Sequence, residues 1–358
     1  MKKIAAALLI MVLVITAAGC LPFGKKGEPT PTGTASPSPS TSDATVKDYF
    51  PFTSNVHMTY EGTGNEYAGF ESWVDYVNNG AYQVRTNNGG TESVAVYLID
   101  DGALKKVFSQ GETYYRYDYT DKREMDETVL MEPIAPGTSW TLPDGDTRAI
   151  TATDLSVTVP YGTFKAVEVT TKSADTTVKE YYARDIGLIK REFITNSDPA
   201  NPITSALKSV ETGSPLTVSL RVYYPDFAGE KVKYVDKSIA LQTGDDIKTK
   251  LEDEFKHVPT GSSLTPVMSA DAAIKSLTFD PATGVATIDF SKTFITGMNA
   301  GSTLEGLILA SVADTVGSYF QTDKVAVTIN GGPYESGHFL YNKGDLLPVD
   351  PDSAVPYK

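Results

Sequence analysis

Polar and apolar positions alternate along most of residues 47–194, in short runs separated by turn dipeptides. The runs are rich in tyrosine and β-branched residues, and they cover 73–77, 82–86, 94–99, 114–119, 149–159, 164–171, 177–183 and 188–194. Asn79-Gly80 and Asp101-Gly102 lie between such runs, and these dipeptides supply the positive φ angles of tight hairpins. The pattern predicts a mostly antiparallel β domain over residues 47–194, whose sheet curves into a half-barrel.

Residues 195–215 break this alternation. They contain Asp198-Pro199, Asn201-Pro202 and Ser214-Pro215, and a residue before proline is biased away from the helical region. We therefore expect a linker at 195–215.

From residue 216 the hydrophobic period changes. Alternating runs at 217–224, 231–240, 274–279, 285–290 and 324–329 predict strands. Ile247, Leu251 and Phe255 recur every four residues and predict one helix, while Ser302 and Glu305 have the spacing of a capping box before a second apolar stripe. The order β-β-α-β-β-α-β predicts a two-layer α+β domain over 216–347, followed by a tail at 348–358.

Several segments of this second region resemble a known family. Residues 222–226 (VYYPD), 284–292 (GVATIDFSK) and 325–331 (VAVTING) resemble the GerMN domain, the sporulation and germination module of endospore-forming bacteria. The resemblance implies a role in sporulation or spore germination. Residues 159–169 and 181–193 resemble an uncharacterised β-rich domain of bacterial lipoproteins, which implies a fold and no activity.

The N-terminus has the pattern of a secretory signal. Lys2 and Lys3 precede an apolar run at 4–15, and small residues at 17–19 lead to Cys20, the one cysteine of the chain. The pattern predicts a signal peptide at 1–19. The ending resembles the bacterial lipobox, which implies that Cys20 carries acyl groups such as palmitate. The alternative is an ordinary signal peptide with Cys20 as a stray thiol.

The amino-acid composition predicts a flexible linker after Cys20 and gives the chain a negative net charge. Residues 20–46 are rich in Pro, Ser and Thr and are predicted to be a disordered linker, because they cannot bury enough apolar surface. The 358 residues hold 31 basic and 45 acidic side chains, a net charge of −14. Loss of Lys2 and Lys3 with the signal peptide leaves 29 basic side chains and a charge of −16. This charge argues against nucleic-acid binding, and it assigns membrane attachment to the lipid.

The chain offers few candidates for chemistry. A single cysteine excludes an intramolecular disulfide and a cysteine-based metal site. The weighed candidates are the histidines at 57, 257 and 338, the Ser205/Lys208 pair, Asp144 with Asp146, and Asp280 with Asp289. Each is better explained as a surface, turn or sheet residue, Asp289 being expected to face solvent. We expect no catalytic residue, no cofactor and no metal site.

These observations favour a lipid-anchored lipoprotein on the extracytoplasmic face of the cell membrane. It would act as a non-catalytic scaffold that binds protein partners of the cell or spore envelope, and would oligomerise through sheet edges and helices. The alternative is an envelope binding module whose β domain holds a lipid or a peptidoglycan-related ligand. An enclosed apolar cavity of several hundred Å³ within the β domain would favour that alternative, and a well-filled sheet would remove it.

Overall fold

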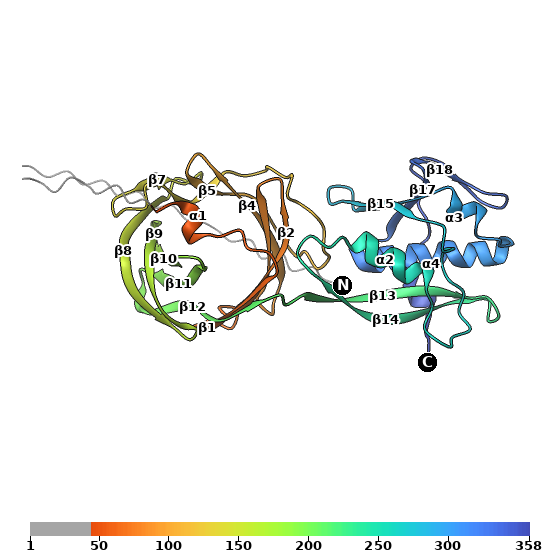
Figure 1. Ribbon diagram of the computed structural model, residues 1–358, viewed down its shortest axis with the longest axis horizontal. Coiled ribbons are helices and arrows are strands. Elements are labelled where there is room, and N and C mark those ends of the chain that lie inside the picture. The colour runs from red at the N-terminus through yellow and green to blue at the C-terminus, as the bar shows by residue number, and fades with distance from the viewer. Residues whose placement is uncertain (1–43) are drawn as a thin grey trace, which may run out of the picture. The chain divides into compact units, whose positions relative to one another are not determined.

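The computed structural model describes residues 44–358, and all of them belong to one compact unit. The predicted signal peptide, Cys20 and the predicted linker up to residue 43 lie outside the described residues. Figure 1 shows how the described helices and strands are arranged.

Residues 56–212 form a twelve-stranded sheet that curves until it is nearly closed (Figure 1). Every pair of neighbouring strands in it is antiparallel. The order across the sheet is β6-β5-β4-β3-β2-β1-β12-β11-β10-β9-β8-β7. The strands are β1 (Val56–Thr63), β2 (Phe70–Asn78), β3 (Ala81–Asn87), β4 (Glu92–Asp100), β5 (Ala103–Gly111), β6 (Glu127–Met131), β7 (Ser139–Thr141), β8 (Thr147–Val159), β9 (Gly162–Lys172), β10 (Thr176–Ala183), β11 (Gly187–Thr195) and β12 (Asp198–Thr212).

The predicted hairpin turns are confirmed where both central residues favour positive φ. Asn79 and Gly80 have φ angles of 50° and 76° between β2 and β3, and Asp101 and Gly102 have 46° and 67° between β4 and β5. Turns of this hand match the twist of the flanking strands. Local sequence therefore sets these two registers.

Two predictions about strands are wrong. Residues 114–119 form no strand, because their aromatic side chains leave the sheet and pack elsewhere, while β5 just before them was not predicted. Residues 198–212 of the expected linker form β12, which pairs with β1 and β11. Pro199 and Pro202 lie in an irregular stretch of the β11–β12 pairing, where a missing N–H costs least.

The two outer strands of the sheet, β6 and β7, are joined by side chains. Trp140 Nε1 on β7 donates a hydrogen bond to the carbonyl oxygen of Thr128 on β6 at 2.9 Å. Arg148 Nη1 on β8 donates to the same oxygen at 3.0 Å, and Arg148 Nη2 lies 3.2 Å from Glu127 Oε1. The sheet thus closes without a backbone ladder between its edges.

A short helix, α1 (Val46–Tyr49), lies within the curve of the sheet (Figure 1). The Val46 side chain is fully buried, and its backbone N–H donates to Glu132 Oε1 at 2.8 Å. The buried side chains around it belong to an internal cluster that includes Leu104, Leu130, Ile150 and Val167. Val46, placed at the end of the predicted linker, is therefore part of the folded core.

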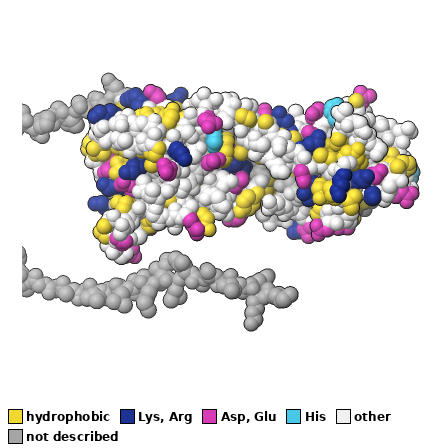
Figure 2. Space-filling model, turned by 90° about the horizontal axis from the view of Figure 1, so that it is seen from below, with side chains coloured by type: hydrophobic (Ala, Val, Ile, Leu, Met, Phe, Trp, Pro, Cys, Tyr) yellow, Lys and Arg dark blue, Asp and Glu magenta, His cyan; other side chains and the backbone are white. Residues whose placement is uncertain are grey.

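The outer surface carries both signs of charge. Lys105 Nζ, for example, lies 3.5 Å from Asp100 Oδ2 and 3.7 Å from Asp126 Oδ1. Acidic and basic side chains are interspersed over the face seen in Figure 2. Ion pairs of this exposed kind contribute little to stability.

The remaining strands form two further sheets. One contains β13 (Leu216–Asp226), β14 (Lys231–Leu241) and β20 (Val355–Pro356), and the other contains β15 (Ile274–Asp280), β16 (Val285–Phe290), β17 (Lys324–Ile329), β18 (Gly332–Glu335) and β19 (Leu340–Tyr341). The helices are α2 (Ile247–Lys256), α3 (Thr293–Thr296), α4 (Ser302–Phe320) and the 3₁₀ helix η1 (Pro351–Ser353). Helix α4 contacts strands of both sheets. The predicted two-layer arrangement is thus replaced by two sheets that share a helix.

The predicted helices occur, but the second is capped differently from the prediction. Ile247, Leu251 and Phe255 of α2 are buried, as their spacing predicts. In α4 the N-cap residue is Gly301, with no side-chain cap, so the predicted capping box is wrong. Glu305 is buried and accepts a hydrogen bond from Tyr334 Oη at 2.7 Å. The Glu305 carboxylate is therefore bonded to Tyr334 and does not cap the helix.

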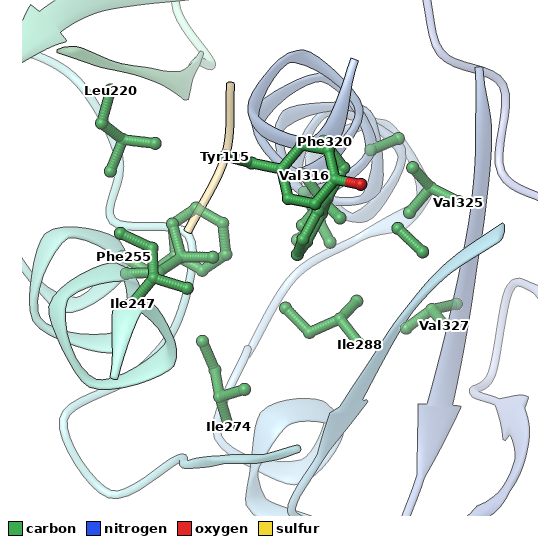
Figure 3. Packing of buried hydrophobic residues seen from close by; sticks show 14 of the residues in the cluster. Tyr115, Leu220, Ile247, Phe255, Ile274, Ile288, Val316, Phe320, Val325 and Val327 are labelled. Carbon is green, nitrogen blue, oxygen red and sulfur yellow. The ribbon is translucent and has the colours of Figure 1, made fainter. Parts of the chain in front are cut away.

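One hydrophobic cluster joins the curved sheet to the region after residue 216 (Figure 3). Tyr115, from the loop after β5, places its ring 5.0 Å from that of Phe279 and 5.3 Å from that of Phe320. Tyr319 Oη on α4 accepts from the backbone N–H of Arg116 at 2.9 Å and donates to its carbonyl oxygen at 3.1 Å. This shared core explains why residues 114–119 have the apolar pattern of a strand without forming one.

A buried ion pair holds that loop in place. Arg85 Nη2 on β3 lies 3.1 Å from Asp75 Oδ2 on β2, and both side chains are almost fully buried. The same nitrogen donates to the carbonyl oxygen of Tyr115 at 2.7 Å. Burial opposes the charge on Arg85, but the carboxylates of Asp75 and Glu92 hold its pKa above the ordinary value.

We predict that Arg85→Met destabilises the protein by about 3–5 kcal/mol, because it leaves Asp75 buried without its closest cationic partner. The measurement is the free energy of unfolding in urea. The matched control is Arg221→Met, which removes an exposed pair with Asp236 and should cost about 1 kcal/mol or less. Equal losses for the two variants would contradict the prediction.

A second prediction concerns Asp314 on α4. Its side chain is buried and accepts from the backbone N–H of Asp350 at 2.7 Å. Burial raises the pKa of Asp314 from 3.8 to about 6. Because the folded state then binds the proton more tightly than the unfolded state, the contribution of Asp314 to stability is present in full at low pH and is lost as the pH rises through about 6.

We therefore expect Asp314→Asn to gain about 1–3 kcal/mol of stability relative to the wild type between about pH 4 and about pH 8. The amide oxygen can still accept the bond from Asp350. Urea unfolding of both proteins across this pH range measures the difference. Parallel stability curves for the two proteins would rule out the proposed titration.

Candidate functional site: the interior of the curved sheet

A cavity of about 510 Å³ lies inside the curved sheet. An adjoining hollow of about 330 Å³ shares some of its lining residues, which are Phe50, Tyr97, Lys106, Leu188 and Arg191. Small-molecule sites typically have volumes of roughly 300–1,000 Å³. The cavity therefore meets the size criterion set from the sequence for a ligand-binding β domain.

One part of the cavity wall is largely apolar. Side chains at alternate strand positions point to the same face of a sheet, and here they come from β1 to β4 and β12. These wall residues are Val56, Met58, Val74, Tyr82, Val84, Ala95 and Val210. The ring of Phe52 stacks on Tyr82 at 4.7 Å, and Tyr82 Oη donates to the carbonyl oxygen of Thr53 at 3.1 Å. This wall can therefore hold a hydrocarbon without leaving the Tyr82 hydroxyl unpaired.

Charged residues lie on the other strands. Glu180 on β10 and Arg191 on β11 are directly paired in register. Arg191 Nε and Nη2 donate to Glu180 Oε1 at 3.0 and 2.8 Å, and Tyr182 Oη donates to Glu180 Oε2 at 3.2 Å. Burial opposes ionisation of Glu180, but Arg191 and Arg148 outweigh it and lower its pKa.

The charged group continues across the closure of the sheet. Lys106 Nζ on β5 lies 2.6 Å from Glu127 Oε2, and Arg148 Nη2 lies 3.2 Å from Glu127 Oε1. With Glu180 and Arg191, this makes three cations and two carboxylates around the smaller hollow. Asp185, in the β10–β11 turn, adds an exposed carboxylate to the lining of the larger cavity. The three cations and two carboxylates of the smaller hollow therefore leave an excess of one positive charge, although the protein as a whole is acidic.

Two side-chain hydrogen-bond donors on the residues shared by the two hollows have no partner among residues 44–358. They are Tyr97 Oη and Arg191 Nη1, on residues that line both hollows. Burial raises the pKa of Tyr97 to about 12, although Arg191 partly opposes the shift. Tyr97 is therefore a neutral donor at ordinary pH. Together the two groups can bind a carboxylate or another anion.

The histidines weighed from the sequence lie apart from this interior. His57 is not among the lining residues, and its ring stacks on that of Trp73, with centroids 4.4 Å apart. His257 follows the last turn of α2, and His338 Nδ1 lies 2.7 Å from Glu305 Oε2. No group of three or more metal-ligating side chains occurs within residues 44–358.

The other weighed pairs do not form reactive sites either. Ser205 Oγ is buried on β12 and donates to the carbonyl oxygen of Ala68 at 2.7 Å, whereas Lys208 is exposed. Asp280 accepts from Thr283 within its turn, and Asp146 accepts from Ser173.

The expectation that Asp289 faces solvent is wrong. The Asp289 side chain is buried, and its Oδ1 accepts from Thr328 Oγ1 and from the backbone N–H of Gly331, each at 2.7 Å. It anchors the turn after β17, which is why a charged residue is accommodated between apolar neighbours.

Sequence reasoning missed the interior residues. Arg191 lies in the run Lys190-Arg191-Glu192, which is typical of an exposed strand. A β-bulge at Ile189 changes the alternation, so that Leu188 and Arg191 point to the same side. Glu180 and Tyr182 are two residues apart on β10 and so share one face of the strand. This spacing was the one indication in the sequence, but it does not tell which face of the sheet is enclosed.

Comparison with known proteins bears on the second region. Residues 221–335 match the family described as Germane, sporulation and spore germination. Residues 221–335 are a Germane domain. This confirms the resemblance drawn from the sequence motifs. A search of curated proteins found no match to the chain.

Solved structures give three further similarities. A candidate exported protein with a YmcC-like fold from Bacteroides fragilis is 14% identical, with a TM-score of 0.30, over 46% of this chain and 99% of that one. A candidate lipoprotein from Parabacteroides distasonis is 15% identical, with a TM-score of 0.30, over 48% and 100%. The tandem GerMN domains of the sporulation protein GerM from Bacillus subtilis are 25% identical, with a TM-score of 0.28, over 39% of this chain and 46% of that one.

In the part of the chain that the structure describes, no helix has the length and apolar character needed to cross a membrane. Cys20 lies outside that part, so its lipidation stays a prediction.

Proposed function

We propose that this protein is a lipid-anchored lipoprotein of the extracytoplasmic face that binds protein partners, without catalysis, in sporulation or spore germination. The observation that carries the proposal is the Germane domain at residues 221–335. The domain's conspicuous polar residues support structural roles, since Asp289 and Glu305 are both engaged in hydrogen bonds within the fold.

The second sheet supports partner binding through an edge. Strand β15 is an outer strand of this sheet and pairs only with β16 among the described strands. An outer strand presents backbone donors and acceptors along one side, which another chain can join. Residues Lys275 and Ser276 near its start are exposed. We propose this edge as a contact with envelope partners or with further copies of the chain.

The anchor is proposed from the N-terminal sequence. A single acyl chain holds a protein at a membrane only marginally, whereas two or more give stable attachment. The net charge of −16 without residues 1–19 would oppose adsorption to anionic lipids. Attachment therefore depends on lipidation of Cys20.

The cavity supports a second candidate function, an envelope binding module whose β domain holds a ligand. Its volume of about 510 Å³, its apolar wall and its unpartnered donors are the features of such a site. This function is compatible with the first, because the cavity and the β15 edge belong to different sheets.

Deletion of the gene in its native host is expected to lower the yield of heat-resistant spores or to slow germination. The measurements are colony counts after heating and loss of optical density after addition of germinant. Complementation with the wild-type gene is the control for effects on neighbouring genes. Normal spores that germinate at the normal rate would refute the proposed role.

Cys20→Ala is expected to abolish incorporation of labelled palmitate and to move the protein out of the membrane fraction, or to leave it unprocessed. The physical reason is that no acyl chain then contributes its roughly 0.8 kcal/mol per buried methylene. Fractionation with immunodetection measures the change. A mature variant that stays in the membrane fraction would show that another anchor exists.

A further inference from the structure

We infer that the interior of the curved sheet binds a single-chain amphiphile with an anionic head, of which a long-chain fatty acid is the simplest example. Tyr97 and Arg191 would bind the carboxylate, and the apolar wall of β1 to β4 and β12 would contact the alkyl chain. This inference rests on the second proposed function, a β domain that holds a ligand, and names the ligand class.

The separation of polar and apolar linings gives the ligand its orientation. The cations Lys106, Arg148 and Arg191 come from β5, β8 and β11, and their carboxylate partners come from β6 and β10. The wall of β1 to β4 and β12 carries mainly valine, methionine, alanine and aromatic side chains, together with Ser72, Thr86, Ser93 and Thr212, none of which is charged. A ligand with one charged end and one hydrocarbon end complements both parts at once.

The proposed head-group site has an unused hydrogen-bond donor that can bind an acceptor of the ligand. Glu180 occupies Nε and Nη2 of Arg191, while Nη1 has no hydrogen-bond partner among the described residues. The Arg191 side chain remains 47% exposed although it lines both hollows. Tyr97 Oη, also without a described partner, adds a neutral donor. Two donors and an excess positive charge favour an anion.

Other occupants fit less well. A peptidoglycan fragment carries many hydroxyl and amide groups, and burying these without partners is costly. The uncharged polar residues of the lining are mostly serines and threonines with one hydroxyl each, and two of them, Thr86 and Ser93, bond to each other at 2.7 Å. The diacylglyceryl group predicted on Cys20 of this same chain has no anion to meet Arg191.

The test uses the chain from residue 20 with Cys20→Ser, so that no covalent lipid competes. The fluorescent fatty acid cis-parinaric acid is titrated into the protein, and palmitate, methyl palmitate and 1-hexadecanol are then used as competitors. We expect palmitate to displace the probe at a concentration about tenfold lower than either neutral analogue, because hydrogen bonds to a charged group are the stronger ones.

Variants locate the head group. Tyr97→Phe removes one unpartnered hydroxyl and should weaken palmitate binding about tenfold. Tyr76→Phe is the matched control, since it removes a hydroxyl from the same sheet outside the cavity, where Tyr76 Oη donates to the carbonyl oxygen of Asp245 at 3.4 Å, and it should leave affinity unchanged. Ala95→Trp fills the apolar part and should abolish binding.

To test Arg191, Glu180 must be changed with it, because removal of the Arg191 charge alone leaves the buried Glu180 carboxylate without its ion-pair partner. The double variant Arg191→Gln with Glu180→Gln removes one charge of each sign, so the net charge of the group is unchanged and the two amides can still form a hydrogen bond. It should lose the preference for palmitate over 1-hexadecanol. Circular dichroism of each variant verifies that it is folded before its affinity is compared.

Three outcomes would overturn the inference: no binding of cis-parinaric acid by the folded protein, equal displacement by palmitate and its neutral analogues, or equal affinities of Tyr97→Phe and Tyr76→Phe. A parallel incubation with a lipid extract of the host membrane separates this failure from that of the broader proposal. If mass spectrometry finds a different lipid bound, the β domain is still a binding module and the fatty-acid assignment is wrong. If nothing in the extract binds, a lipid ligand of any class is ruled out as well.

Discussion

The carbonyl oxygen of Thr128 accepts hydrogen bonds from Trp140 and Arg148, which lie on the opposite side of the gap between β6 and β7. Closure of the curved sheet depends on this contact, because no backbone ladder joins its two outer strands. Arg148 also pairs with Glu127, and Glu127 pairs with Lys106. Closure therefore places charged groups from both edges inside the sheet. Buried charges are tolerated only when paired and hydrogen-bonded, and these pairs satisfy that condition.

The same strands serve the interior and the attachment to the Germane domain. On β3, Tyr82 and Val84 point into the cavity, whereas Gln83 and Arg85 point outward. Arg85 holds the loop whose Tyr115 enters the shared hydrophobic core. Strand alternation thus gives one short segment two functions.

Much of the secondary structure follows from local sequence, and the failures have identifiable causes. Residues 114–119 were assigned to the sheet because their aromatic pattern is that of a strand. Tyr115 instead packs in a hydrophobic core that is built from segments distant in sequence. Residues 198–212 were assigned to a linker because of Pro199 and Pro202, yet an irregular part of the pairing accommodates both. In each case a contact distant in sequence outweighed a local preference.

By itself, the sequence determined the hairpins at Asn79-Gly80 and Asp101-Gly102, the buried stripe of α2, the motifs of the Germane domain and the predicted lipid signal at Cys20. These depend on residues close together in the chain, so spacing and residue type suffice to indicate them. Only the tertiary structure decided which face of the sheet is enclosed. A bulge at Ile189 turns Arg191 inward, and closure brings Lys106 and Arg148 to the same carboxylate. A one-residue change of register exchanges the two faces of a strand, and no local pattern records it.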